Sequence, residues 1–97
     1  MELTSKQRAH LRGLAHHVDP TVQIGDRGVS SAVVAKVVAE LESHELIKVK
    51  LGDTDVKAKD VAPILAEQSG AAVVQVIGKV VVLYKRRAKK PTIELPG

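Results

Sequence analysis

The sequence predicts an α/β fold, a compact single domain whose three helices and four strands follow the order α-β-α-β-α-β-β. Three segments have apolar residues at helical spacing, short alternating runs lie between them, and the last two runs flank a two-residue turn, Gly78-Lys79. At 97 residues the chain has room for one hydrophobic core. Because helices alternate with strands before a final hairpin, we expect a four-stranded mixed sheet.

The first predicted helix begins at residues 4–7, where Thr4 and Gln7 have capping-box spacing. We expect its apolar face to consist of Leu3, Leu11, Leu14 and Val18. A basic row recurs every four residues on another face and consists of Arg8, Arg12 and His16. Gly13 costs a helix about 1 kcal/mol relative to alanine, which would be explained by a close approach to the backbone at this point. Pro20 ends the segment.

The next two elements are a short strand at 21–24 and a helix that begins at Ser30 or Ser31. In the strand, Val22 and Ile24 should face inward. The apolar stripe of the helix should consist of Val34, Val37, Val38 and Leu41. A second strand at 46–51 alternates apolar residues with Lys48 and Lys50. We therefore expect this strand to turn two lysines to solvent.

A third helix is predicted over 53–69, with Val61, Ile64 and Leu65 on its apolar face. Pro63 cannot donate a backbone hydrogen bond, so we expect a kink, or a start near Asp60 after an irregular turn. Gly70 is a favourable helix stop. Two strands, at 72–77 and 80–84, complete the predicted fold.

The net charge of +4 is concentrated at the C-terminal end of the chain. Residues 1–84 contain ten Lys or Arg and ten Asp or Glu, so a basic surface there must arise by segregation of charge. We divide the chain into a folded domain at 1–84 and a basic tail at 85–97. The excess cations of the tail are Lys85, Arg86, Arg87, Lys89 and Lys90. Such a tail either serves solubility as a disordered segment or attracts an anionic partner.

Several functional classes are disfavoured by composition. The chain has no cysteine, which removes disulfides, thiolate metal sites and thiol catalysis. No apolar run approaches the roughly 20 residues that span a bilayer, so we expect a soluble, cytoplasmic protein with no membrane partner. His10 and His17 share a helix face but are too far apart for one metal ion. Without an acid-base pair or nucleophile motif either, we expect no enzyme activity, metal or cofactor.

Residues 25–28, Gly-Asp-Arg-Gly, lie directly before the second predicted helix. Two interpretations are open. The glycines serve only a tight turn, or they leave backbone amides accessible to a phosphate beside the positive end of the helix. Tyr84 is the single aromatic residue, which disfavours a sheet that stacks nucleobases. A nucleic acid would therefore be recognised through its backbone and shape.

Three stretches resemble the YhbY family, the free-standing form of the CRM (chloroplast RNA splicing and ribosome maturation) domain. They are LRGLAHHVDPTVQIGDRGVS, HELIKVKL and GAAVVQVIGKVVVLYKR, in family order and spacing. The resemblance implies a fold similar to the C-terminal domain of bacterial translation initiation factor 3. It also implies RNA binding through a G-x-x-G loop like that of KH domains. Bacterial members are associated with precursors of the large ribosomal subunit.

Carried onto this chain, the resemblance places the RNA-binding loop at Gly25, Asp26, Arg27 and Gly28. We add the basic row and the five tail cations as further RNA-binding residues. Asp26 departs from the family pattern, because a carboxylate beside a phosphate is unfavourable. We expect it to point away, pairing with Arg27 or capping the following helix.

The predicted function is a non-enzymatic RNA-binding protein, a monomer, that acts in assembly of the large (50S) ribosomal subunit. Its partners would be ribosomal RNA precursor and large-subunit particles. One alternative is a structural or protein-interaction module stably bound to the ribosome. A small enzyme acting on RNA and a protein that binds DNA through its tail are further alternatives.

Overall fold

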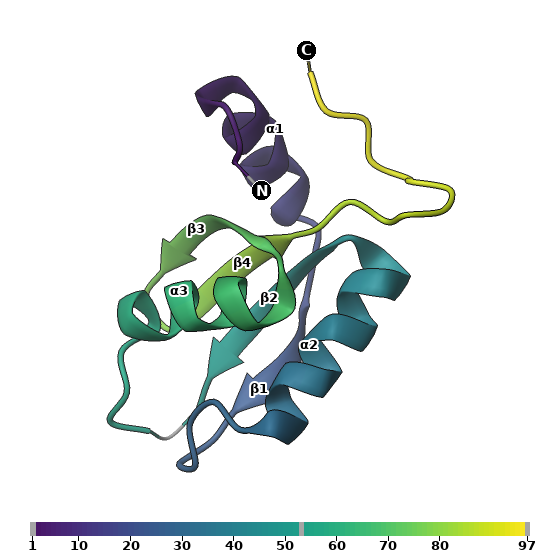
Figure 1. The fold of residues 1–97 in the computed structure, drawn as a ribbon. Coiled ribbons are helices and arrows are strands. Elements are labelled where there is room, and N and C mark those ends of the chain that lie inside the picture. The colour runs from purple at the N-terminus through teal and green to yellow at the C-terminus, as the bar shows by residue number, and fades with distance from the viewer. Residues whose placement is uncertain (1, 53, 97) are drawn as a thin grey trace.

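A computed structural model describes residues 2–52 and 54–96. Its elements are α1 (Ser5–Ala15), β1 (Pro20–Ile24), α2 (Ser31–His44), β2 (Leu46–Leu51), α3 (Ala58–Ser69), β3 (Ala72–Ile77) and β4 (Val80–Tyr84). This is the predicted order, and the predicted α/β class is confirmed (Figure 1). The four strands form one mixed sheet in the order β1-β2-β4-β3.

The pairing of the strands determines at which end of the sheet each connection lies. β1 and β2 are parallel, and Ile24 at the end of β1 is opposite Leu51 at the end of β2. β2 and β4 are antiparallel, and Tyr84 at the end of β4 is opposite Leu46 at the start of β2. The chain therefore leaves β1 at one end of the sheet and leaves β4 at the other.

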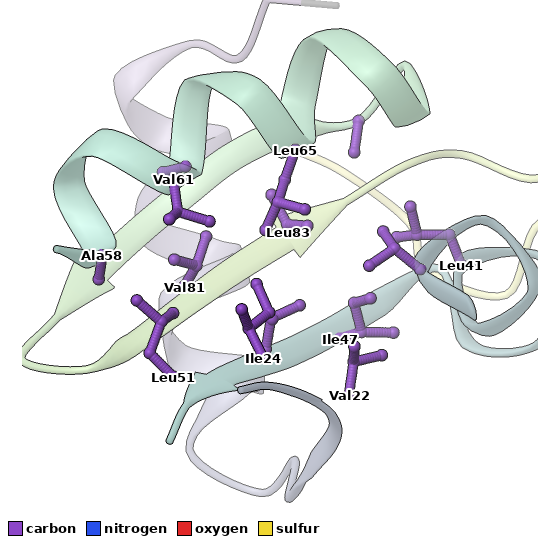
Figure 2. Close-up of a cluster of buried hydrophobic side chains, with 14 residues drawn as sticks. Val22, Ile24, Leu41, Ile47, Leu51, Ala58, Val61, Leu65, Val81 and Leu83 are labelled. Atoms are coloured by element: carbon purple, nitrogen blue, oxygen red, sulfur yellow. The ribbon is translucent and has the colours of Figure 1, made fainter. Parts of the chain in front are cut away.

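The larger core lies between the first face of the sheet and helices α2 and α3 (Figure 2). Strand residues at alternate positions point into it, as a period of two requires. Fully buried members are Ile24, Val49, Val81, Leu83, Val37 and Leu65. The predicted inward positions of β1 and β2 are confirmed.

A smaller core lies on the second face, where α1 covers only part of the sheet. Leu11 and Ala15 pack with Leu46, Val82 and Tyr84. These strand residues lie toward the start of β2, so the part toward its end stays uncovered. There Lys48 is half-buried and Lys50 is exposed. The prediction that β2 turns two lysines to solvent is confirmed fully for Lys50 and in part for Lys48.

Two predicted core residues lie at the surface instead. The side chain of Leu14 is 37% exposed and that of Ile64 is 45% exposed. Each lies at the edge of the buried face of its helix. Successive residues are about 100° apart around the axis, and other residues occupy the centre of that face. In α1 that face is set by Leu11 and Ala15. In α3 small residues, Ala58 and Ala62 among them, occupy the buried face in place of Ile64.

Local signals determine the helix ends. The predicted capping box of Thr4 and Gln7 is present, and Ser30, rather than Ser31, caps α2 by accepting a hydrogen bond from the Val33 N–H. α3 begins at Ala58, later than the predicted residue 53, after the irregular turn that Pro63 suggested. The prediction for residue 53 itself lies outside the described residues. Gly70 ends α3 with a φ of 77°, in the left-handed region.

Replacement of Gly13 by alanine tests the interior of α1. The residue is exposed, and an added Cβ would meet no atom of the described chain within 4 Å. No part of the protein accounts for this glycine, so Gly13→Ala should raise the free energy of unfolding by about 1 kcal/mol. Urea denaturation followed by circular dichroism measures the change. A loss of stability would contradict the uninterrupted helix described above.

Candidate nucleic-acid interface

The glycine loop, residues 25–28, is a tight turn between the end of β1 and the start of α2. The Gly28 N–H donates to the Gly25 carbonyl oxygen at 3.1 Å, which closes the turn. Gly28 has a φ of 67°, a conformation that side-chain-bearing residues rarely adopt. Gly25 needs no such conformation, and open space surrounds the position of its missing Cβ. Only Gly28 is therefore required by the turn itself.

Two backbone amides of the loop are available to a ligand. The N–H groups of Asp26 and Arg27 donate to no acceptor in the described part of the chain, and both residues are exposed. The Ser30 hydroxyl already uses the Val33 N–H of α2. The positive end of this 14-residue helix nevertheless lies beside the turn. The Gly28 N–H is already used by the turn, so the loop itself offers fewer amides to an anion than the glycine pattern alone indicates.

Asp26 does not pair as the sequence analysis expected. Among residues 2–52 and 54–96 no carboxylate pairs with a lysine or arginine, the one close acid–base contact joins Glu40 to His44, and Ser30 caps α2. Both expectations for Asp26, a pair with Arg27 and a helix cap, are therefore wrong. Asp26 instead lines a cavity of about 310 Å³ together with Thr54, Asp55 and Val56. Because this side of the loop is anionic, a phosphate would approach from the side of Arg27.

Charge is segregated between the two layers that cover the sheet. α1 and β2 together carry five Lys or Arg and no Asp or Glu. α2 and α3 together carry two Lys and four Asp or Glu. The second face of the sheet is therefore basic and the opposite layer is acidic, although residues 1–84 contain equal numbers of cationic and acidic residues. A basic surface on the folded domain, residues 1–84, requires this segregation of charge.

The basic row lies on α1, with Arg12 and His16 exposed and Arg8 half-buried. None of the three forms an ion pair within the described residues, so the arginine charges are available to phosphates. Leu14 lies roughly 160° around the helix from Arg12. Leu14 borders a cavity shared with Ile93, so the row faces away from that part of the C-terminal segment.

The C-terminal segment, residues 85–96, is held against the domain by one buried carboxylate. Glu45 lies between α2 and β2 and is fully buried, with a φ of 61°. Its carboxylate accepts hydrogen bonds from the Arg87 N–H at 2.9 Å and the Ile93 N–H at 3.0 Å. It also accepts from both the N–H and the hydroxyl of Thr92. Lys89 and Lys90 therefore lie in a closed loop between two anchored points, Arg87 and Thr92, whereas Lys85 and Arg86 lie between the end of β4 and the first of these points.

These hydrogen bonds change the acidity of Glu45. Burial by itself raises the pKa of a carboxyl group, because it disfavours the charged form. The donors from Thr92, Arg87 and Ile93 outweigh burial and lower the pKa to about 2. Glu45 is thus a carboxylate at neutral pH, and no cation is needed to keep it charged.

The twelve candidate residues occupy three separate places. The glycine loop lies at the end of β2, while the C-terminal segment begins opposite its start. Five residue steps of β2 separate these ends by roughly 17 Å. The basic row lies on α1, over the half of the second face near the start of β2. Figure 1 shows the loop and the two termini at opposite ends of the molecule.

Lys48 and Lys50 lie between these places and were not among the predicted site residues. Lys50 is beside Gln23 of β1 and Val80 of β4 on the uncovered part of the second face. The alternation of β2 revealed their exposure, but only the strand order shows that they connect the loop to α1. Glu45 was also missed, since a single acid between two apolar runs carries no sequence signal for an anchor.

Within 2–52 and 54–96, no three His, Asp or Glu side chains are grouped in a way that could hold a metal ion. No helix of this part of the chain combines the length and the apolar character that crossing a membrane requires.

The chain is thus a small α/β domain with a basic sheet face and a glycine turn. Residues 3–85 match the model of the CRS1 / YhbY (CRM) domain. The chain therefore belongs to the CRS1/YhbY (CRM) domain family.

Similar proteins match nearly the whole length of the chain. It is 40% identical to an RNA-binding protein of Haemophilus influenzae, covering 97% of this chain and 95% of the relative. It is 41% identical to the Probable RNA-binding protein YqeI of Bacillus subtilis, covering 97% and 99%. The solution structure of the hypothetical protein SAV1595 from Staphylococcus aureus superimposes with a TM-score of 0.84 at 38% identity. That match covers 98% of this chain and 100% of the other.

The anchor at Glu45 predicts an acid-sensitive C-terminal segment. The folded pKa of about 2 lies below the ordinary value of 4.5. The contribution of Glu45, about 3 kcal/mol, is therefore complete above pH 4.5 and is lost as the pH falls toward 2. Hydrogen exchange at the Thr92 and Ile93 amides should accelerate over this interval, after correction for intrinsic rates.

Glu45→Gln is the control for this titration. The amide accepts weaker hydrogen bonds, so the Thr92 and Ile93 amides should already exchange faster at pH 7. Their protection should then show little further dependence on acid. An unchanged acid response in this variant would assign the effect to another carboxyl group.

Proposed function

We propose that this protein binds RNA through the basic second face of its sheet and acts in assembly of the large ribosomal subunit. The observation that carries the RNA-binding part is the segregation of charge: α1 and β2 hold five cationic side chains without one acid. The names of the two bacterial relatives, which describe RNA binding, support the same ligand.

The glycine loop contacts one end of the bound RNA in this proposal. The exposed N–H groups of Asp26 and Arg27 donate to a phosphate oxygen, and the Arg27 guanidinium adds a charge-assisted hydrogen bond. Gly25 lets the ribose-phosphate backbone approach closely, because no side chain stands there. Asp26 lines a cavity with Asp55, and in this proposal the phosphate lies on the other side of the loop.

The RNA then runs from the loop along the uncovered part of the second face. Lys50 and Lys48 neutralise the next phosphates, and Arg12 and Arg8 of α1 continue the contact. At the far end, the C-terminal segment supplies its own cations: Lys85, Arg86, Arg87, Lys89 and Lys90. Because such contacts go to phosphates, they fix position without reading sequence.

The ribosomal part of the proposal is supported by family membership and by the kind of surface. The ligand is ribosomal RNA precursor, the particle is an unfinished large subunit, and the protein acts without catalysing a reaction. An extended basic face suits folded RNA that presents phosphates from several strands. The contrasting candidate is a structural component that stays on the finished ribosome.

Sedimentation of a gently lysed cell extract separates the two candidates. An assembly factor should migrate with particles slightly lighter than the mature large subunit and should leave them at moderate salt. A structural component should stay on mature subunits at the same salt. A protein found only at the top of the gradient would remove the ribosome from the proposal.

RNA binding should depend steeply on salt. If about six phosphates are neutralised, affinity for ribosomal RNA fragments should fall roughly a thousandfold between 50 and 200 mM salt. Lys50→Ala should reduce the slope of log Kd against log salt by almost one. Fluorescence anisotropy with labelled RNA measures both quantities, and duplex DNA as competitor tests the choice of nucleic acid.

Lys59→Ala is the matched control for Lys50→Ala. Lys59 is equally an exposed lysine, but it lies on α3 in the acidic layer. Its replacement should leave the salt slope unchanged. Equal slopes for the two variants would show that the second face of the sheet is not the RNA surface.

Two substitutions in the glycine loop test the phosphate contact. Gly25→Ala meets open space and needs no left-handed backbone, so the melting temperature should stay nearly unchanged. RNA affinity should fall about tenfold, which corresponds to about 1.4 kcal/mol, because the methyl group blocks the RNA backbone.

Asp26→Asn removes the anion beside the same contact. RNA affinity should rise about twofold to threefold at low salt and less at high salt, because exposed charges are screened. If neither loop variant changes RNA affinity, the loop is only a turn. Binding would then depend on the basic face alone.

A further inference from the structure

A cavity of about 540 Å³ lies between the N-terminal part of α1 and the C-terminal segment, over the end of β4. Its volume is in the range of small-molecule sites. Its lining includes Gln7, Tyr84, Arg86, Ile93, Glu94 and Leu95. One wall is fixed, because the Gln7 side-chain amide donates to the Pro96 carbonyl oxygen at 3.2 Å. Glu45 fixes the same segment further, through Arg87 and Ile93.

Tyr84 lines this cavity and carries a buried hydroxyl whose hydrogen bonds the described residues do not satisfy. The residue is fully buried, and its hydroxyl has no hydrogen-bond partner among residues 2–52 and 54–96. A buried polar group without a partner costs about 1–3 kcal/mol, and native structures rarely contain one without a cause. Burial, and then the Glu45 charge, raise the pKa of Tyr84, while Arg86 lowers it. At neutral pH the group is therefore a hydroxyl that can both donate and accept.

The other lining groups complete a set that matches a flat heterocycle. Ile93 and Leu95 belong to the partly buried apolar residues of the smaller core and provide aliphatic walls. Arg86 is exposed, offers several N–H donors and a planar face, and has no carboxylate partner in the described chain. Glu94 offers an acceptor. A phosphate fits this set poorly, because Glu94 repels it and the walls are apolar.

We propose that this cavity holds one unpaired nucleobase of the bound RNA. The inference rests on the proposed RNA binding and adds the class of RNA element that is recognised. The faces of a base lie against Ile93, Leu95 and the Arg86 guanidinium, and its edge atoms bond to the Tyr84 hydroxyl and to Glu94. A base inside a duplex cannot reach the cavity, so the site selects a bulge, loop or strand end. Neighbouring cations of the C-terminal segment hold the flanking phosphates.

Titration with the four ribonucleoside 5′-monophosphates, followed by NMR, tests this site without an RNA sequence. Saturable shifts are expected at the Gln7 side-chain amide and the Leu95 methyl groups, with a Kd near 1 mM, which corresponds to about −4 kcal/mol. Ribose 5-phosphate carries the same phosphate without a base and should leave these signals in place. Equal shifts with ribose 5-phosphate, or no saturable shift with any nucleotide, would overturn the proposal.

Tyr84→Phe separates a binding role from a structural one. Removal of the unpartnered hydroxyl should leave the melting temperature unchanged or raise it, while nucleotide affinity falls about fivefold. Arg86→Gln, at the exposed rim, should also weaken nucleotide binding without loss of stability. A lower melting temperature with unchanged nucleotide affinity in Tyr84→Phe would assign the hydroxyl to the fold and contradict the site.

Gly25→Ala distinguishes this proposal from the proposed function. The variant changes the glycine loop at the other end of the sheet, so nucleotide shifts at the cavity should match those of the unchanged protein. If RNA binding depends on salt but nucleotides cause no NMR shifts at the cavity, only the proposed nucleobase site is contradicted. Absence of RNA binding contradicts the proposed function, whatever the nucleotide titration gives.

Discussion

The antiparallel pairing of β2 with β4 decides where each functional surface can lie. β1 runs parallel to β2, so both strands end on the same side, and the glycine loop follows β1 there. β4 runs the other way and delivers the C-terminal segment to the opposite side. No choice of side chains in the loop or the segment could bring the two together. Any ligand that contacts both must be extended and must cross the second face of the sheet.

Glu45 holds the C-terminal segment against the folded domain. Three backbone N–H groups and one hydroxyl surround its carboxylate, and they come from residues more than forty positions away in the sequence. Desolvating a charge is costly, and here donors from the segment itself offset that cost. Five cations of a flexible tail would give only diffuse attraction. Held between Arg87 and Ile93, the segment can instead form the wall of a cavity with a defined shape.

Much of the fold could be predicted because its signals are local. The capping box at Thr4, the glycine after α3 and the two-residue turn before β4 each depend on a few neighbouring residues. Leu14 and Ile64 were misplaced because helical periodicity defines a broad face, and only tertiary packing decides which edge is buried. The role of Glu45 could not be predicted, since it depends on contacts between distant segments. The expected pairing of Asp26 was wrong for a related reason: this residue lines a cavity with residues 54–56, which are distant from it in the sequence.

The same logic applies to charge. A chain with equal numbers of cations and anions over residues 1–84 suggests no basic surface by composition. The fold places the acids of α2 and α3 on one side of a sheet and the cations of α1 and β2 on the other. The sheet lies between the layer of α2 and α3 and the layer of α1, and adjacent layers are roughly 10 Å apart, so the acids of α2 and α3 are more than one Debye length, about 8 Å at physiological salt, from a phosphate on the second face. Acids on the far layer are therefore largely screened from a phosphate on the near face. The segregated cations act as a local basic surface, and the small net charge of the body limits non-specific attraction from other directions.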